Sequence, residues 1–282
     1  MSARLFVFGL GYSAGLLARE LLAAGWRVAG TTRDAAKADR LRRDGIETFL
    51  FGRTQPLDPA ALAGTTHLLS SIAPDAAGDP VLDLHGADLR ALGLRWSGYL
   101  STTGVYGDLG GRWAFEETPL SPQSREAINR AKAEDQWLSA GASLFRLPGI
   151  YGPGRSQLER VREPGARRII KPDQVFSRAH VSDIASALKL AMSKRARGAF
   201  NICDDEPAPA DEVLAYAAQL LGLAPPPAVA FEDANLSPAA KRFYAECKRV
   251  SNAKAKAMLG WRPRFPTYRE GLLDCLQRAA ST

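Results

Sequence analysis

The sequence begins with an apolar run that leads directly into a glycine-rich turn. Residues Leu5 to Phe8 are all apolar, which is typical of a parallel strand buried on both faces of a sheet. The pattern Gly9-x-Gly11-x-x-Ala14 follows, and then a segment whose leucines fall on one side of a helix. A strand, a tight turn and a helix in this order predict the first half of a βαβ unit.

The small residues of the turn fit the approach of a phosphate. Gly9 permits the sharp turn, Gly11 lets the backbone come close to a pyrophosphate, and Ala14 lets the helix pack near the strand. The start of the helix offers free N–H groups and a partial positive charge. We therefore expect a dinucleotide at Gly9, Leu10, Gly11, Tyr12, Ser13 and Ala14. The alternative is a glycine turn that binds no ligand.

Strand-like and helical segments alternate along most of the 282 residues. This rhythm predicts an α/β fold with a doubly wound parallel sheet. We expect residues 1–154 and 176–205 to form the nucleotide-binding domain, and residues 155–175 and 206–282 a smaller lobe on the substrate side. The stretch 155–175 is basic and is expected to be irregular.

The end of the second predicted strand, near residue 33, indicates which dinucleotide is bound. NAD-binding proteins usually carry an acidic residue there, which binds the ribose 2′-hydroxyl. This chain has Thr32 and Arg33, followed by Asp34. A guanidinium suits a 2′-phosphate in charge and in geometry. We therefore predict NADP in preference to NAD; alternatively, Arg33 is a solvated loop residue.

A further predicted strand, 66–72, is expected to end beneath the cofactor. Ligands gather at the carboxyl ends of parallel strands. This places Ser71, Ile72 and Ala73 in the predicted cofactor site.

Composition and charge exclude several other classes of protein. The net charge is +7, but the basic residues are dispersed and accompany no nucleic-acid-binding motif. No apolar run reaches the roughly 20 residues of a membrane helix, and the amino terminus lacks the pattern of a signal peptide. The three cysteines lie far apart in the sequence and indicate reduced thiols. We expect a cytoplasmic protein that binds a small molecule, without nucleic acid or membrane, and without a metal.

Several motifs resemble the extended short-chain dehydrogenase/reductases, the superfamily of nucleotide-sugar epimerases and dehydratases. The matching stretches, in chain order, are 99–108 (YLSTTGVYGD), 146–154 (RLPGIYGPG), 180–184 (HVSDI), 200–202 (FNI) and 259–263 (LGWRP). The resemblance covers nearly the whole chain. It implies a Rossmann fold with a small carboxyl-terminal lobe, binding of NAD(P), and a possible homodimer.

The resemblance also implies a catalytic set, from which this chain departs. The Ser/Thr of the family falls on Thr102, for which the alternative is a turn threonine that bonds its own backbone. Pro148 falls among the residues expected to bind the cofactor. The Tyr-x-x-x-Lys pair falls on Glu126 and Arg130, so the usual tyrosine is missing, and the family's Asn falls on Asp83. An atypical subgroup of the family, similar in its final 248–252 stretch (KRVSN), shows the same poor retention and an uncharacterised reaction.

These departures leave two functions open. In the first, the protein is an NADP-dependent oxidoreductase or epimerase/dehydratase: Thr102 orients a polar substrate, Glu126 or Tyr106 moves a proton, and Arg130 holds the ribose. Arg155, Arg168 and Arg178 could then meet an anionic substrate. In the second, which the missing tyrosine favours, the protein is a non-catalytic NADP(H)-binding redox sensor. A separate alternative for Glu126 and Arg130 is that they form only a surface ion pair.

Overall fold

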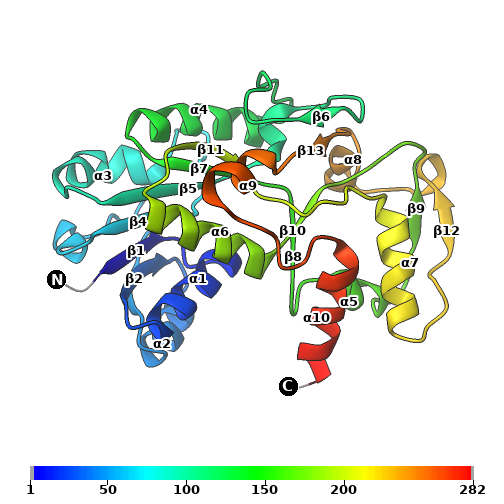
Figure 1. The fold of residues 1–282 in the computed structure, drawn as a ribbon, viewed down its shortest axis with the longest axis horizontal. Coiled ribbons are helices and arrows are strands. Elements are labelled where there is room, and N and C mark those ends of the chain that lie inside the picture. Colours follow the sequence, from blue (N-terminus) through cyan, green and yellow to red (C-terminus); the bar gives the residue numbers. More distant parts are fainter. Residues whose placement is uncertain (1–2, 281–282) are drawn as a thin grey trace.

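The protein is built around one parallel sheet. The structure, a computed structural model, describes residues 3–280 and contains a seven-stranded sheet in which all neighbouring strands are parallel (Figure 1). The strand order is β11 (Gly198–Asn201), β7 (Ser143–Leu147), β5 (Trp96–Thr102), β4 (His67–Ser70), β1 (Arg4–Phe8), β2 (Arg27–Thr32) and β3 (Glu47–Leu50). The chain order reverses between β1 and β4, where open α/β sheets form a ligand-binding crevice.

The apolar run at the amino terminus forms the centre of the sheet. All five residues of β1 are buried, because layers of helices cover both faces. Phe6 lies level with Ala29 of β2 and with Leu68 of β4. The predicted α/β class and doubly wound parallel sheet are therefore confirmed.

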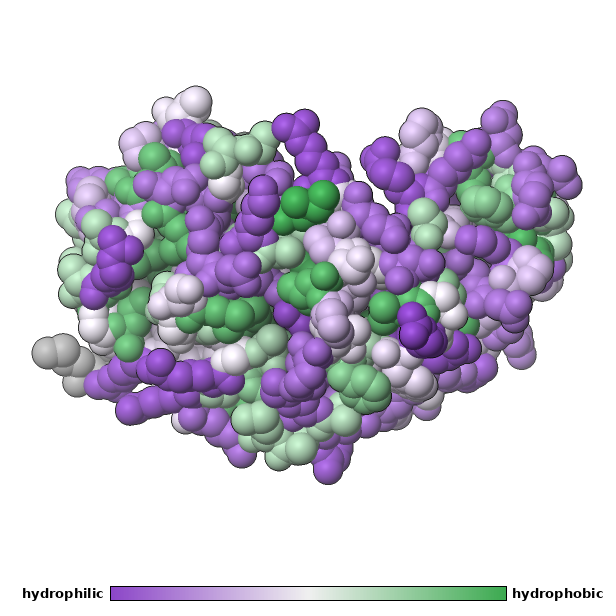
Figure 2. All heavy atoms as spheres, turned by 90° about the horizontal axis from the view of Figure 1, so that it is seen from above, coloured by the Kyte–Doolittle hydropathy of each residue, from purple (hydrophilic) through white to green (hydrophobic). Residues whose placement is uncertain are grey.

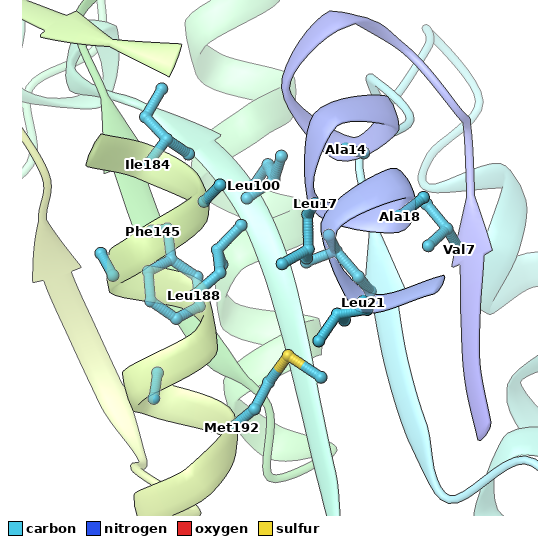
Figure 3. Close-up of a cluster of buried hydrophobic side chains, with 14 of the residues drawn as sticks. Val7, Ala14, Leu17, Ala18, Leu21, Leu100, Phe145, Ile184, Leu188 and Met192 are labelled. Carbon is cyan, nitrogen blue, oxygen red and sulfur yellow. The ribbon is translucent and has the colours of Figure 1, made fainter. Parts of the chain in front are cut away.

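One face of the sheet is covered by α1 (Tyr12–Ala23), α2 (Ala35–Arg43), α6 (Val181–Lys194) and α9 (Ala253–Leu259). Figure 3 shows how α1 and α6 pack together, with Leu17 and Leu21 of α1 directed toward Leu188 and Met192 of α6. All four side chains are buried. This packing fixes the start of α1 relative to the sheet.

The other face is covered by α3 (Pro80–Ala91) and α4 (Arg125–Ser139). Trp137 of α4 stacks on Tyr99 of β5 with ring centroids 5.5 Å apart. Its indole N–H donates to the carboxylate of Asp79, which also caps the amino terminus of α3. One buried aspartate therefore joins the two helices of this layer.

A smaller lobe lies beyond one end of the sheet (Figure 1). Its elements are α5 (Gln157–Val161), α7 (Ala210–Leu220), α8 (Pro238–Phe243), α10 (Tyr268–Ala280) and the paired strands β9 (Arg168–Ile170) and β12 (Ala228–Ala230). Val213, Ala217, Leu272 and Cys275 are among the buried residues of its core.

Short paired strands lie between the sheet and the lobe. β8 (Gly149–Tyr151) pairs with β10 (Arg178–His180), and β6 (Trp113–Ala114) pairs with β13 (Arg249–Val250). They bring segments far apart in sequence to the carboxyl edge of β5 and β7.

Two segments differ from the sequence-based expectation. The stretch 155–175 is not wholly irregular, because it contains α5 and β9. The first is a five-residue helix held by a capping box between Ser156 and Glu159, and the second pairs only with distant β12. Helix α9 lies within the predicted lobe range 206–282, yet Ala255 and Leu259 pack with α6 in the core beside the sheet.

A buried ion pair connects α4 to the sheet. Arg146 of β7 and Glu134 of α4 are 5% and 1% exposed, and Arg146 Nη2 lies 2.7 Å from Glu134 Oε2. Nη1 of Arg146 also donates to the hydroxyl of Tyr106, which in turn donates to Asn201 Oδ1 of β11. Every member of this network therefore has a partner, as buried polar groups require.

Polar side chains predominate on one face of the molecule (Figure 2). On the face seen in Figure 2, hydrophilic side chains surround small groups of hydrophobic ones. Within residues 3–280, no helix combines the length and the hydropathy needed to cross a bilayer.

The buried ion pair gives a prediction about stability. Replacing Glu134 by Ala leaves the buried Arg146 without its carboxylate, so the free energy of unfolding falls by about 3–5 kcal/mol. Urea unfolding measures the change. Glu117→Ala is the matched control, because Glu117 forms an exposed pair with Lys254 and its loss costs about 1 kcal/mol or less. Equal losses in the two variants would contradict the prediction.

Candidate functional site

Hydrogen bonds from both neighbouring strands hold the glycine turn after β1. Thr31 of β2 accepts the Gly9 N–H on its hydroxyl (2.9 Å) and the Leu10 N–H on its carbonyl (2.8 Å). Ser71, just after β4, donates its hydroxyl to the Gly9 carbonyl at 2.6 Å. Gly9 has φ +86°, and a Cβ there would lie 2.9 Å from Ile72 Cγ1. The turn therefore requires glycine at this position.

The start of α1 fits a phosphate. Gly11 is the N-cap residue, and no side chain caps this helix. A Cβ on Gly11 would meet nothing closer than 4.0 Å, so the space in front of the helix is open. Ser13 and Ala14 are buried behind it. Uncapped N–H groups at an open helix start form an anion-binding site, so these residues fit the pyrophosphate of a dinucleotide.

At the end of β2, Arg33 and Asp34 have different surroundings. Arg33 is exposed, and its guanidinium has no partner among residues 3–280. Asp34 is the N-cap of α2, and its carboxylate accepts the Lys37 N–H at 2.9 Å. Thr32 accepts the Asp34 N–H at 3.3 Å. Asp34, the acidic residue nearest this strand end, therefore already accepts a backbone hydrogen bond.

A cavity of about 800 Å³ lies where β5 and β7 end. Thr102 is the last residue of β5, Pro148 follows β7, and Glu126 is in the first turn of α4; all three line this cavity. Thr102 Oγ1 accepts the Gly104 N–H at 3.1 Å, so its own hydrogen remains available to a ligand. The structure thus brings together three residues that are distant in sequence.

The cavity adjoins the glycine turn through Tyr12. The hydroxyl of Tyr12, at the start of α1, donates to the Pro153 carbonyl at 2.9 Å. Arg155, which lines the cavity, lies over the Tyr12 ring with Cζ 5.6 Å from its centroid. The dinucleotide fingerprint and the cavity are therefore neighbours.

Two other predicted site residues have structural partners instead. Nη1 of Arg130 donates to the Tyr99 hydroxyl (3.0 Å) and to the Leu100 carbonyl (2.8 Å). Among residues 3–280 no ion pair joins it to Glu126, so the surface pair considered above is absent. Asp83 pairs with Arg53 at 2.9 Å. Neither Arg130 nor Asp83 lines the cavity.

Tyr106 is unsuited to the proton transfer considered for it. It is fully buried, does not line the cavity, and is bonded to Arg146 and Asn201. Burial raises the pKa of Tyr106 to about 12. Arg168 also lies away from the cavity and donates to the Pro226 carbonyl, whereas Arg155 and Arg178 do line it.

Several residues of the site were not found from the sequence. Thr31 holds the glycine turn through its hydroxyl, but a threonine inside a strand carries no signal of that role. Tyr151, Phe176, Lys248 and Tyr268 line the cavity from segments that meet only in the folded chain. Of these, Tyr151 and Lys248 lie inside quoted motifs, 146–154 and 248–252, but neither motif assigned them to the site.

The chain was compared with known proteins. No protein-family model matches it. A 3-diazoavenalumate denitrifying reductase from Streptomyces is 33% identical over 179 residues, which cover 56% of this chain and 57% of the reductase. The chain therefore matches little more than half of that relative.

Two solved structures are similar over almost their whole lengths. A conserved protein of unknown function from Silicibacter pomeroyi is 46% identical, with a TM-score of 0.92 and coverage of 98% of this chain and 99% of the other. The dTDP-glucose 4,6-dehydratase of Bacillus anthracis, solved in complex with NAD, is 17% identical, with a TM-score of 0.80 and coverage of 100% and 97%. The chain therefore belongs to the family of the Silicibacter protein, and it has the same fold as the NAD-bound dehydratase.

Proposed function

We propose that the protein is an NADP-dependent oxidoreductase or epimerase/dehydratase acting on a small molecule. The observation that carries the proposal is that Thr102, Glu126 and Pro148 line the same cavity, which lies beside the glycine turn. The substrate binds in this cavity, and the cofactor lies along the crevice between β1 and β4. The lobe closes the substrate side.

The choice of cofactor rests on Arg33 and Asp34. The glycine turn fits the pyrophosphate of either dinucleotide, so the strand end after β2 decides between them. Asp34 already accepts the Lys37 N–H through Oδ1 as the cap of α2, so the acid at this strand end has a structural role. The unpartnered guanidinium of Arg33 suits a 2′-phosphate. The choice of NADP is our own inference, since the solved dehydratase is bound to NAD.

Each polar side chain of the cavity has its own role in the proposed reaction. When bound, the nicotinamide supplies or accepts a hydride. Thr102 donates its hydroxyl hydrogen to a substrate oxygen, and Glu126 accepts or returns the substrate proton. Glu126 lies in the first turn of α4, where the helix dipole favours a carboxylate. Arg130 is bonded to Tyr99 and Leu100 of β5 and orients this helix instead of holding the ribose.

The sensor function remains the second candidate because of one observation. Helix α4 has no tyrosine in the position of the family's proton relay. A protein that only reports the redox state of NADP(H) needs the glycine turn and no proton relay.

The proposed function gives three predictions, of which the first concerns the preference for NADP. Arg33→Ala weakens binding of NADPH by about 10- to 100-fold, because hydrogen bonds to a charged group contribute about 1.5–3 kcal/mol. Binding of NADH stays the same. Quenching of tryptophan fluorescence measures both. Arg43→Ala is the matched control, because Arg43 is an exposed arginine at the end of α2; an equal effect there would remove Arg33 from the site.

A second prediction separates capping from cofactor binding. Asp34→Ala lowers the free energy of unfolding by about 1 kcal/mol, the usual loss for an N-cap. It leaves the ratio of the dissociation constants for NADPH and NADH unchanged. Chemical unfolding and the same fluorescence titration provide the two readouts. A variant that loses NADH binding would instead make Asp34 a ribose ligand.

A third prediction separates enzyme from sensor. A suitable panel contains simple ketones and aldehydes, dTDP-glucose, and aromatic diazonium compounds, the last because of the Streptomyces reductase. With any compound that is turned over, Glu126→Gln lowers kcat by about a hundredfold or more, and Thr102→Val lowers kcat/KM. Neither variant changes the affinity for NADPH. Turnover unaffected by both variants would place the chemistry elsewhere, and no turnover with tight NADPH binding would favour the sensor.

A further inference from the structure

Three arginines are buried in the part of the chain that the structure describes, and one of them lacks a counter-ion. Arg4, Arg146 and Arg178 are 2%, 5% and 8% exposed. Arg4 pairs with Glu47 at 2.8 Å and Arg146 with Glu134 at 2.7 Å. Within residues 3–280, Arg178 has no carboxylate within 4.0 Å. Because a buried charge is costly unless it is paired, Arg178 is the exception to explain.

The position of Arg178 is fixed by the backbone around it. It is the first residue of β10, and its carbonyl accepts the Asp204 N–H at 2.8 Å. Its Nη1 donates to the carbonyls of Phe176 (2.8 Å) and Ala208 (3.0 Å). Nε and Nη2 have no acceptor among the described residues, and Arg178 lines the cavity. One edge of the guanidinium is therefore anchored, and the other is left for a ligand.

No nearby acid forms a direct ion pair with Arg178 within residues 3–280, although its charge interacts with that of Asp204. Asp204 is 3% exposed, and neither carboxylate oxygen has a hydrogen-bond partner among the residues described. Burial raises the pKa of Asp204 well above its usual range, which favours its neutral form. Glu206 is already paired with Arg269 at 2.5 Å.

The other charges of the cavity are engaged or exposed. Lys248 pairs with Glu246 at 2.5 Å, and Arg155 lies over the ring of Tyr12. Glu159 accepts the Ser156 N–H as part of a capping box. The remaining charged side chains of the lining are exposed: Arg160, Arg242, Glu126 and Glu163. Arg178 is therefore the buried, unpaired cation of the cavity wall, which suits one anionic group.

Apolar and aromatic side chains line the cavity together with this cation. Tyr268 lies with its ring centroid 6.0 Å from Arg178 Cζ. Other apolar or aromatic side chains of the lining include Val175, Phe176, Val213, Val250 and Leu272. A cavity with one fixed cation and an apolar wall suits a ligand with one charged end and an apolar body.

We propose that Arg178 binds the carboxylate of an organic acid through its Nε and Nη2 edge, while the apolar body of that acid packs on the cavity wall. The two remaining donors match the two oxygens of a carboxylate. The proposal deepens the function proposed above and rests on it, since it identifies the class of substrate. A phosphate monoester has the same oxyanion chemistry, and the experiment separates the two.

Calorimetric titration of the full-length protein without dinucleotide tests the proposal. The probes are 3-phenylpropionate, its uncharged amide, and inorganic phosphate. We expect 3-phenylpropionate to bind at least about tenfold more tightly than the amide, the difference that one charge-assisted hydrogen bond makes. Arg178→Gln should abolish this difference, and Arg178→Lys should retain part of it. Arg168→Gln, which removes an arginine outside the cavity, should have no effect.

Three outcomes overturn the proposal: no saturable binding of 3-phenylpropionate, equal binding of acid and amide to the wild-type protein, or a response to phosphate alone. If Arg178→Gln fails to fold, the Nε–Hε resonances of ¹⁵N-labelled wild-type protein decide. One arginine resonance should shift with the acid and not with the amide, and no such shift counts against the site. Because dinucleotide is absent, acid binding and NADPH binding can fail independently.

Discussion

The hydrogen bonds that Thr31 and Ser71 make to the turn after β1 are the interactions on which the site depends. A turn enclosed between two strands must find partners for its backbone groups, and Thr31 supplies both a hydroxyl and a carbonyl. Ser71 closes the opposite side by donating to Gly9. The start of α1 is thereby fixed above the crevice between β1 and β4, with its N–H groups directed to open space.

The buried arginines show how the same residue type serves stability in one place and binding in another. Arg146 has a complete set of partners, including a carboxylate, so it joins α4 to the sheet and leaves nothing for a ligand. Arg178 is held by two carbonyls, both bonded to its Nη1, and has no carboxylate partner within residues 3–280. A rigid, partly satisfied guanidinium in a cavity wall is pre-organised for an anion, because it loses little freedom on binding.

The missing tyrosine has a chemical consequence for the proposed mechanism. In the usual pair, a lysine lowers the pKa of the tyrosine so that a phenolate can form. A carboxylate needs no such help near neutral pH, since the ordinary pKa of glutamate is about 4.3 and that of tyrosine about 10. This is consistent with Arg130 being bound to Tyr99 and Leu100 instead of facing the cavity.

The sequence by itself determined the parallel sheet, the glycine turn and the succession of the main strands along the chain. These follow from local patterns: apolar runs, glycine spacing and helical periodicity. Only the tertiary structure decided that Thr102 and Glu126 line one cavity while Asp83 forms an ion pair with Arg53. It also decided that Asp34 is a cap and that Arg178 lacks a counter-ion. The physical reason is that the role of a charged side chain depends on its interaction partners, and those partners come from segments that only the folded chain brings together.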